Sequence, residues 1–257
     1  MTDHHARVVA AFTEQAETFQ NPRLNQAFTS ALDWLVELID PEPGGTWLDV
    51  AGGTGLVARK LAQRVGKVVC VDATEAMLDA GRSEAASDGV RNIEFVRGDA
   101  LALPPGPFDG VVTRFSFHHL EEPRRALEAM TSVCAPGGRI AVKDLIASAE
   151  PGLRERQDHI ESLRDDSHLR MVLGGEVAAW ASELGLIVES PVVRELERPL
   201  EPWLAQSRTP PERAHAVREE LTAELDGGER TGMRPHRRGS ELWFRQTWEV
   251  TLARKPG

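Results

Sequence analysis

The sequence predicts a doubly wound α/β fold, in which helices cover both faces of a largely parallel, Rossmann-like sheet. A short apolar run over residues 46–50 leads into a glycine-rich turn at 51–55 and then into a helical pattern. Short apolar runs continue to alternate with amphipathic helical patterns as far as residue 145, which is typical of βαβ units. The 257 residues are enough for one large domain with a substantial core.

Two amphipathic helices are predicted ahead of the sheet. Residues 6–20 place apolar side chains on one face, and Asn21-Pro22 ends this pattern. A second helix is expected over residues 24–39, closed by the proline- and glycine-rich turn at 41–45.

The glycine-rich turn predicts a nucleotide-like ligand. Gly52, Gly53 and Gly55 permit positive φ and let a ligand approach the backbone, and the following helix start presents unpaired N–H groups. Residues 53–58 also fit the G-x-G-x-x-G/A pattern of dinucleotide folds. The turn by itself therefore leaves two ligand classes open.

Asp49 distinguishes these two classes by charge. At the end of its strand, this carboxylate would face the two negative charges of a pyrophosphate at short range, which is unfavourable. S-adenosylmethionine (SAM) instead brings an ammonium and a sulfonium, which the same carboxylate attracts. The charge argument favours SAM, and a NAD(P)-dependent oxidoreductase is the alternative.

The run L-D-V-A-G-G-T-G at residues 48–55 resembles motif I of the class I SAM-dependent methyltransferases. The resemblance implies that Asp49, Gly53 and Gly55 bind the cofactor. Ala51 stands where the family often carries its first glycine, and we include it in the expected cofactor site.

The N-terminal helix resembles that of the UbiE-like branch of this family. The pattern F-x-x-Q-A-x-x-F at residues 12–19, followed by a helix and motif I, carries the resemblance. In that branch the first helix folds over the cofactor, which would make Phe12, Gln15 and Phe19 lid residues. A helix that only packs on the core is the alternative.

The second strand, residues 67–72, ends in Asp72, one βαβ unit beyond the glycines. An acid in this place can accept hydrogen bonds from both ribose hydroxyls, and Ala73 lies beside it. Met77 follows in the helix expected over residues 75–85. We expect Met77 near the adenine, with an ordinary core methionine as the alternative.

Gly98-Asp99-Ala100 directly follows the strand predicted over residues 93–97. This G-D-A resembles the family motif in which the aspartate accepts the adenine amine and the next backbone N–H meets a ring nitrogen. A turn or helix cap is the alternative use of Asp99.

The strand at residues 107–113 is followed by R-F-S-F-H-H-L, and "F-D-x-V-x-x-x-x-x-x-H-H-L" resembles the fourth motif of these enzymes. In open α/β sheets ligands bind at the carboxyl ends of strands, so this segment should flank the sulfonium. Arg114 is expected to meet the cofactor carboxylate or a substrate anion. A helix at 123–134 and a strand at 139–145 follow.

Methyl transfer is an in-line displacement that needs a base when the acceptor carries a proton. The candidate bases are His118, His119, Asp144 and His168. Consecutive histidines point in different directions, so at most one of the first two should face the methyl group. His119 is the predicted base, and a histidine that only packs at a helix start is the alternative.

The second half of the chain is less regular. Helical patterns cover residues 153–171, 176–184 and 212–225, and strand-like patterns cover 186–194 and 239–252. In the family two late strands form an antiparallel pair at the sheet edge, and the resemblance assigns residues 186–194 and 248–254 to it. The resemblance therefore implies a seven-stranded sheet whose last strand is antiparallel, with a helical cap insertion.

We accordingly expect one methyltransferase domain over residues 1–257. Its parts are an N-terminal helical lid (1–40), a cofactor-binding core (41–146), a mixed cap and late strand (147–240) and a C-terminal edge strand (241–257). Lid and cap should enclose the acceptor, and the expected substrate-binding residues are Phe12, His118, Asp144, His168 and Trp243.

Composition narrows the classes of partner. The formal net charge of -10 argues against a protein that grips nucleic acid through a basic face. No apolar run is long enough to cross a bilayer and no signal pattern begins the chain, so we expect a cytoplasmic monomer or homodimer. Cys70 and Cys134 have no C-x-x-C partner, and no metal is expected.

The sequence therefore predicts a SAM-dependent methyltransferase that acts on a small-molecule acceptor of the quinone, phenol or secondary-metabolite type. The alternatives are a SAM-binding protein without transferase activity and the oxidoreductase named above.

Overall fold

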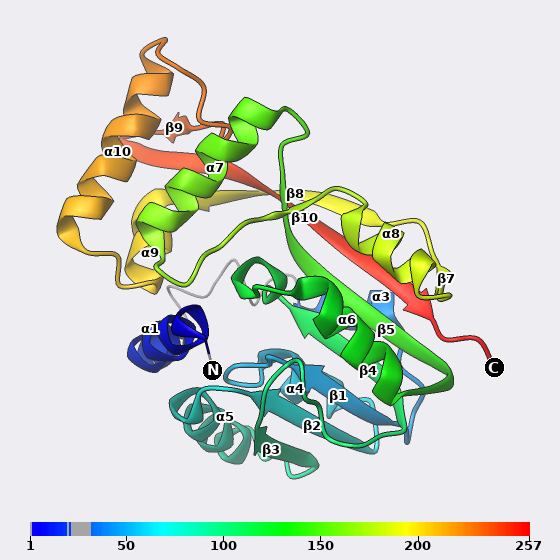
Figure 1. The fold of residues 1–257 in the computed structure, drawn as a ribbon. Helices are drawn as coiled ribbons and strands as arrows, with labels where there is room; N and C mark the ends of the chain where they lie inside the picture. Colours follow the sequence, from blue (N-terminus) through cyan, green and yellow to red (C-terminus); the bar gives the residue numbers. More distant parts are fainter. Residues whose placement is uncertain (1, 20, 22–31) are drawn as a thin grey trace.

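The computed structural model describes residues 2–19, 21 and 32–257 (Figure 1). The first half of the chain forms, in order, α1 (Asp3–Phe19), α3 (Leu32–Ile39), β1 (Thr46–Val50), α4 (Leu56–Leu61), β2 (Lys67–Asp72), α5 (Glu75–Ser87), β3 (Ile93–Arg97), β4 (Phe108–Arg114), the 3₁₀ turn η1 (Phe117–His119), α6 (Pro123–Val133) and β5 (Cys134–Ala147). The second half forms α7 (Pro151–Arg164), β6 (Val172–Leu173), α8 (Glu176–Glu183), β7 (Ile187–Val188), β8 (Val192–Pro199), α9 (Leu200–Gln206), α10 (Pro211–Leu225), β9 (His236–Arg238) and β10 (Glu241–Arg254).

The sheet has seven strands along its main path, in the order β3-β2-β1-β4-β5-β10-β7. Strands β3 to β5 along this path pair in parallel, whereas β10 is antiparallel to both of its neighbours. Strands β6, β8 and β9 pair with β5 or β10 outside this path. This confirms the predicted doubly wound, mostly parallel sheet with an antiparallel late strand.

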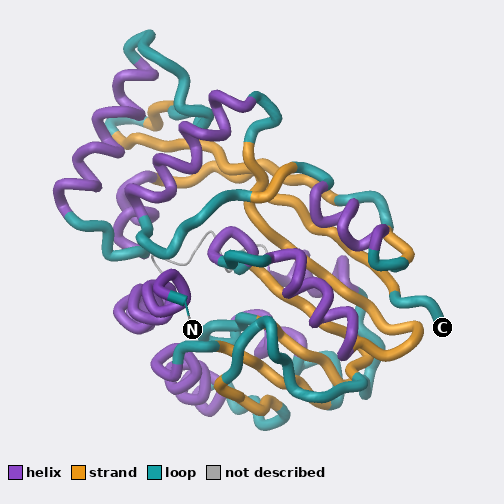
Figure 2. The backbone as a smooth tube through the Cα atoms, viewed as in Figure 1, coloured by secondary structure: helices purple, strands orange, loops and turns teal. Residues whose placement is uncertain are grey.

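Helices cover both faces of the sheet, as Figure 2 shows. One core lies between the sheet and α6 and α8, and a second core lies between the opposite face and α3 and α4. Because both faces are buried, the central strands read as nearly continuous apolar runs, such as Val68–Val71 within β2.

Helices α7, α9 and α10 lie together at one end of β10 and form a separate cap (Figure 1). They pack around the buried side chain of Phe244, which belongs to β10. The rings of Trp203 and Phe244 lie 4.6 Å apart in this third core. Strand β10 therefore runs from the cap into the sheet, where its later residues pair with β5. The sequence did not predict α9, whose seven residues are too few to show a clear helical period.

Two predicted elements differ in extent from those observed, and a third is described only in part. The strand expected at residues 186–194 is divided into β7 and β8, which both pair with β10. The helix expected over 153–171 ends at Arg164, because the Asp165 carboxylate accepts the backbone N–H of Ser167 and forms a turn instead. Of the helix expected at 24–39, residues 24–31 lie outside the described part.

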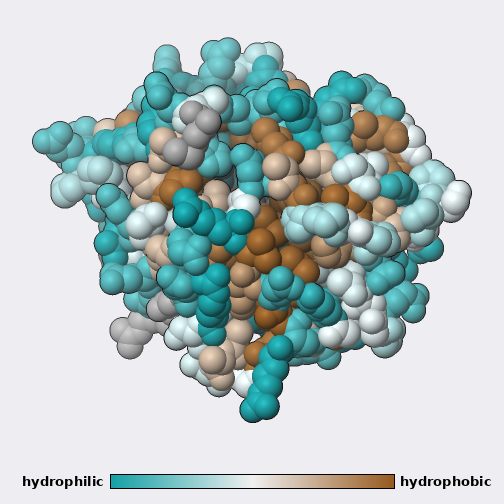
Figure 3. All heavy atoms as spheres, turned by 60° about the horizontal axis from the view of Figure 1, so that its bottom comes forward, coloured by the Kyte–Doolittle hydropathy of each residue, from teal (hydrophilic) through white to brown (hydrophobic). Residues whose placement is uncertain are grey.

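The face in Figure 3 carries apolar side chains gathered in its middle, with hydrophilic side chains around them. Among the described helices, none combines the length and the apolar character that a bilayer crossing requires.

Candidate functional site

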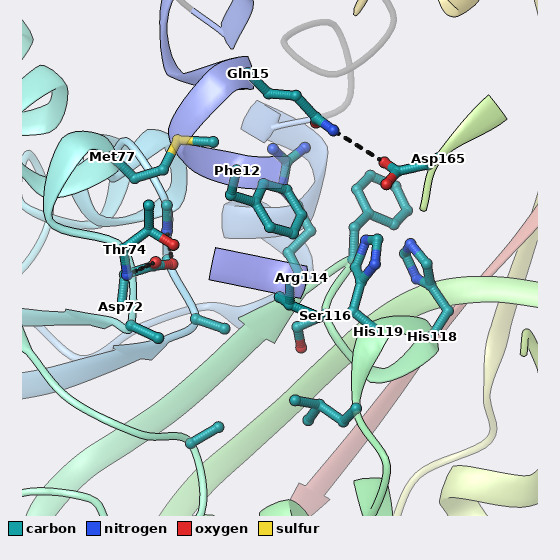
Figure 4. A pocket seen from close by; sticks show the side chains of 18 of the residues that line it. Phe12, Gln15, Asp72, Thr74, Met77, Arg114, Ser116, His118, His119 and Asp165 are labelled. Carbon is teal, nitrogen blue, oxygen red and sulfur yellow. Dashed lines mark hydrogen bonds between the residues drawn. The ribbon is translucent and has the colours of Figure 1, made fainter. Parts of the chain in front are cut away.

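A cavity of about 340 Å³ opens at the carboxyl ends of β1, β2 and β4, beneath α1 and beside the cap (Figure 4). Most of the residues predicted from the sequence line it. They are Phe12, Phe19, Asp49, Ala51, Gly53, Asp72, Ala73, Met77, Gly98, Asp99, Ala100, Arg114, His118 and His119. The predicted residues outside this lining are Gly55, Asp144, His168 and Trp243.

The cavity has two ends of different chemistry. We call the part around Asp49, Asp72 and Asp99 the acidic end, and the part around His118, His119 and Asp165 the histidine end. In Figure 4 Asp72, Thr74 and Met77 lie at one side of the view and the two histidines and Asp165 at the other, with Phe12 and Arg114 between them.

Strand alternation explains why three charged side chains meet at the acidic end. Trp47, Cys70 and Val112 belong to the core on the α3 and α4 face. Since side chains two residues apart lie on the same face of a strand, Asp49, Asp72 and Arg114 emerge on that face too. Asp72 and Arg114 are the last residues of β2 and β4, and Asp49 is the last but one of β1 between them, so all three lie at one edge of the sheet.

Asp49 is a buried carboxylate, and only one of its two oxygens has a hydrogen-bond partner among the described residues. Its Oδ2 accepts the backbone N–H of Ala58 at 2.9 Å, while Oδ1 is buried without a hydrogen-bond partner among the described residues. Burial raises the pKa of Asp49 to about 7, against the lowering effects of the Ala58 N–H and of Arg114. A cationic ligand group near Oδ1 would compensate this buried charge.

Asp72 is held in place by two backbone donors. Its Oδ2 accepts the N–H of Gly53 at 2.8 Å, and its Oδ1 accepts the N–H of Thr74 at 2.9 Å. Burial raises the pKa of Asp72, although both of these hydrogen bonds favour the carboxylate. Each oxygen retains capacity to accept a ligand hydroxyl.

The glycine-rich turn approaches both strands closely. A Cβ at Gly52 would lie 2.5 Å from the Cys70 sulfur, so no larger residue fits there, whereas a Cβ at Gly53 would meet nothing within 4 Å. The open space at Gly53 is on the cavity side, where a ligand can approach the backbone. Ala51 adopts a φ of 51°, a left-handed conformation that glycine would adopt without strain.

Gly55 has a different role from the one that the sequence suggested. It precedes α4 with a φ of 68°, and a Cβ there would lie 2.8 Å from the Phe95 ring. The residue is therefore required for packing of the turn against β3, and it does not line the cavity.

Asp99 and Met77 border the far side of the acidic end. Asp99 Oδ1 accepts the N–H of Leu101 at 2.9 Å, so Asp99 forms the turn that was its alternative role and also lines the cavity. Met77 is fully buried in α5 and contributes to the cavity wall.

At the histidine end, His118 and Asp144 form a buried pair. Their Nδ1 and Oδ1 atoms lie 2.5 Å apart, and Asp144 Oδ2 accepts the N–H of Phe117 at 2.7 Å. Asp144 is two residues after Val142 on β5, and Val142 belongs to the core on the α6 and α8 face. The Asp144 side chain therefore points to that face, away from the acidic end, and lies behind His118. Burial lowers the pKa of His118, but the charge and hydrogen bond of Asp144 outweigh burial and raise it above 6.5.

His119 is held in a different way. Its Nδ1 lies 3.0 Å from the Ser167 carbonyl oxygen, which can only accept, so Nδ1 carries the proton. The Phe12 ring of α1 meets the His119 ring edge-on at 5.0 Å. Burial, and then the neighbouring His118, lower the pKa of His119 to about 3, so the imidazole stays neutral at ordinary pH.

His168 and Trp243 lie away from the cavity. His168 Nε2 is 2.9 Å from Asp158 Oδ1, and its ring is 5.7 Å from the His118 ring. Trp243 contacts Arg238 and donates its indole N–H to Glu241 at 3.0 Å. Trp243 and Trp248 are five residues apart on β10 and so face opposite sides, and it is Trp248 that lines the cavity.

Other side chains that the sequence did not single out complete the histidine end. They are Asp165, Arg164, Arg198, Gln246 and Trp248, all from the cap or β10. Gln15, a predicted lid residue, donates to Asp165 Oδ2 at 3.3 Å and so joins α1 to the cap (Figure 4). The alternation of buried positions 244, 246 and 248 on β10 was the one signal that could have indicated Gln246 and Trp248.

Comparison with known proteins identifies relatives of this chain. The family model of a methyltransferase domain matches residues 48–138, which run from motif I into the first residues of β5. YafE of Escherichia coli, an uncharacterized protein, is 33% identical over 159 residues, which cover 61% of this chain and 77% of YafE. YcgJ of Bacillus subtilis, an uncharacterized methyltransferase, is 30% identical over 172 residues, 66% of this chain and 68% of YcgJ.

The crystal structure of Bacillus subtilis YcgJ superposes with a TM-score of 0.81 at 25% identity, covering 89% of this chain and 99% of YcgJ. UbiE of Legionella pneumophila (strain Paris), a ubiquinone/menaquinone biosynthesis C-methyltransferase, is 35% identical over 131 residues, 49% of this chain and 52% of UbiE. These matches decide against the oxidoreductase alternative. The chain belongs to the class I SAM-dependent methyltransferases, and its cofactor is SAM.

Proposed function

We propose that this methyltransferase transfers the methyl group of SAM to a small-molecule acceptor of the quinone, phenol or secondary-metabolite type. The observation that carries the proposal is one continuous cavity, whose acidic end suits the cofactor and whose histidine end is closed by α1 and the cap. A pocket of this kind, with apolar walls and few polar groups, is typical of small-ligand sites.

The acidic end has the groups that SAM requires. Asp72, fixed by two backbone donors, would accept the ribose hydroxyls, and Asp99 with Gly98 and Ala100 would meet the adenine. The unpartnered Oδ1 of Asp49 would accept the ammonium group. Bound SAM supplies an electrophilic methyl group, and these residues orient it toward the histidine end.

Arg114 is suited to the carboxylate of the cofactor. It lines the cavity, and the charge of Asp49 favours its protonated form, although burial lowers its pKa to about 10. Phe12 and Phe19 of α1, 6.2 Å apart, would cover the cofactor from above. Met77 would contact the adenine from α5.

The similarity to UbiE, a ubiquinone/menaquinone biosynthesis C-methyltransferase, supports an acceptor of the quinone type. That match covers about half of UbiE, so the cap that surrounds the acceptor here is argued from this structure. In this proposal the enzyme works in the cytoplasm as a monomer or homodimer, and its net charge of -10 disfavours nucleic acid as the acceptor.

Calorimetry and a transfer assay test the proposal. Purified protein should bind S-adenosylhomocysteine in the low micromolar range or tighter, and NAD(H) much more weakly. With methyl-labelled SAM, label should move to members of a panel of hydroquinones and phenols. Label that moved to transfer RNA and to no small molecule would contradict the proposed acceptor class.

A further inference from the structure

The most distinctive chemistry at the histidine end is the buried pair of His118 and Asp144. Their side chains are 6% and 1% exposed, respectively. Asp144 also accepts the backbone N–H groups of Phe117 and Leu145, both at 2.7 Å. The carboxylate is therefore fixed by the backbone and holds the imidazole in one orientation.

This orientation leaves one basic atom toward the cavity. A carboxylate accepts, so the 2.5 Å contact places the proton of neutral His118 on Nδ1 and the lone pair on Nε2. His118 lines the cavity, whereas Asp144 lies behind the wall, so Nε2 at the other edge of the ring is on the cavity side. No described residue makes a hydrogen bond to Nε2.

We propose that His118, held by Asp144, is the general base of the reaction and that the acceptor presents an acidic hydroxyl, as phenols and hydroquinones do. The inference rests on the proposed transfer to a small molecule. It replaces the predicted base His119 and names the chemical class of the acceptor. An amine that is already nucleophilic without losing a proton would have no need of this pair.

The proposed reaction is one proton transfer coupled to one displacement. The acceptor O–H bond breaks and its proton moves to His118 Nε2. The electron pair left on oxygen forms the bond to the methyl carbon, and the carbon–sulfur bond breaks with its pair remaining on sulfur. The products are the methyl ether, S-adenosylhomocysteine and an imidazolium that Asp144 stabilises until its proton returns to solvent.

The charges around the pair favour His118 rather than His119 as the general base. His118 is faced by Asp144 from β5, by Glu161 from α7 and by Asp165, all of which raise its pKa. The His119 ring lies 4.0 Å away and the His168 ring 5.7 Å away. His119 donates a hydrogen bond from Nδ1 to the neutral carbonyl of Ser167, and its pKa is about 3. It is therefore a poor proton acceptor.

Matched asparagine variants separate the two histidines. Asparagine places an amide N–H near the position of Nδ1, so His118→Asn keeps a donor to Asp144 and His119→Asn keeps a donor to Ser167. With 1,4-naphthalenediol as acceptor, His118→Asn should lower kcat by about 10²–10⁴-fold. It should leave the affinity for S-adenosylhomocysteine within a few fold, and His119→Asn should cost much less turnover.

The pH profile gives a readout that a structural role would not move. A base must be neutral to act, so kcat/KM of the wild type should rise with pH and level off through a pKa above 6.5. Asp144→Asn should move this inflection about one to three pH units lower.

Imidazole ¹⁵N NMR of the complex with S-adenosylhomocysteine tests the pair without any acceptor. The His118 signal should titrate above pH 6.5 in the wild type and lower in Asp144→Asn, while the His119 signal stays neutral. A wild-type His118 that titrates below 6.5, or full diol turnover by His118→Asn, overturns the proposal. Failure to bind S-adenosylhomocysteine at all would instead reject the cofactor site, which is a separate result.

Discussion

The acidic end and the histidine end of the cavity both contain buried carboxylates, but their pKa values are shifted in opposite directions. Burial raises the pKa of Asp49 to about 7 and also raises that of Asp72. At the histidine end burial also acts to raise the pKa of Asp144, but His118 and two backbone N–H groups lower it overall.

The difference shows what each end requires. At the acidic end Arg114 offsets only part of the negative charge, because burial still raises the pKa values of Asp49 and Asp72, and the ammonium and sulfonium of SAM would add the missing positive charge. The histidine end is compensated by its own residues, because Asp144 is paired with His118 and Asp165 accepts from Gln15, Ser167 and Ser207. One end is therefore suited to binding a cation, and the other to moving a proton.

The largest expected effect tests the acidic end. Asp72→Ala removes the acceptor for two ribose hydroxyls, and charged hydrogen bonds contribute roughly 1.5–3 kcal/mol each. The affinity for S-adenosylhomocysteine should fall by about 10²–10⁴-fold. Asp49→Asn, which keeps a polar group, should cost less in the same calorimetric titration. A variant Asp72→Ala that bound the cofactor normally would show that the ribose lies elsewhere.

The second prediction concerns α1, which connects the two ends. This helix packs against α5 and α9, and Thr18 Oγ1 donates to the Gln206 carbonyl in the cap at 2.7 Å. Deleting residues 1–20 should leave a folded sheet, weaken cofactor binding and lower turnover on the order of 10²-fold, because the closed site orients the acceptor.

Hydrogen exchange provides the control in the full chain. Adding S-adenosylhomocysteine should slow exchange in α1 as well as at residues 53–56. Protection at residues 53–56 with unchanged exchange in α1 would mean that α1 is structural. The helix would then not close over the cavity when the cofactor binds.

The third prediction uses the raised pKa of Asp49. A cationic ligand binds the ionised carboxylate, and in the free protein Asp49 becomes protonated as the pH falls below about 7. Affinity for S-adenosylhomocysteine should be constant above that pH and fall by up to about tenfold per pH unit below it. The same titration series on Asp49→Asn should be flat. Equal slopes in both proteins would remove the charge argument for this end.

The smallest expected effect concerns the turn itself. Ala51 at a φ of 51° bears left-handed strain of about 1–2 kcal/mol, and the greater chain entropy of glycine offsets about 0.5–1 kcal/mol of any relief. Ala51→Gly should therefore raise the free energy of unfolding in urea by about 0.5–1 kcal/mol. A loss of stability would show that the methyl group of Ala51 contributes packing.

The sheet and the acidic end could be predicted because their signals are local. Asp49 and Asp72 each end an apolar strand, and the backbone donors that hold them lie within about one βαβ unit of the chain. The histidine end depends on contacts between distant residues. His118 and Asp144 are 26 positions apart, Gln15 and Asp165 are 150 apart, and no periodic pattern connects such partners.

His119 illustrates the limit of the sequence argument. Both histidines follow the same strand, and our proposal of His118 rather than His119 as the base rests on the carboxylate behind His118. That carboxylate lies on β5, and its direction follows from strand alternation together with the position of η1, which the sequence pattern does not fix.

The path of β10 has a consequence for engineering acceptor range. The cap lies between β5 and β10, and β10 continues unbroken from Phe244 in the cap to its pairs with β5 in the sheet. A cap taken from a relative could be joined at Ala147 and within β10, but only with an unchanged residue count along that strand. A shift by one residue would turn Gln246 and Trp248 out of the cavity and present Arg245 and Thr247 to it. Chimeras that keep this register should retain a closed histidine end of the cavity. Chimeras that shift the register should lose that closure, even if every cap residue is compatible.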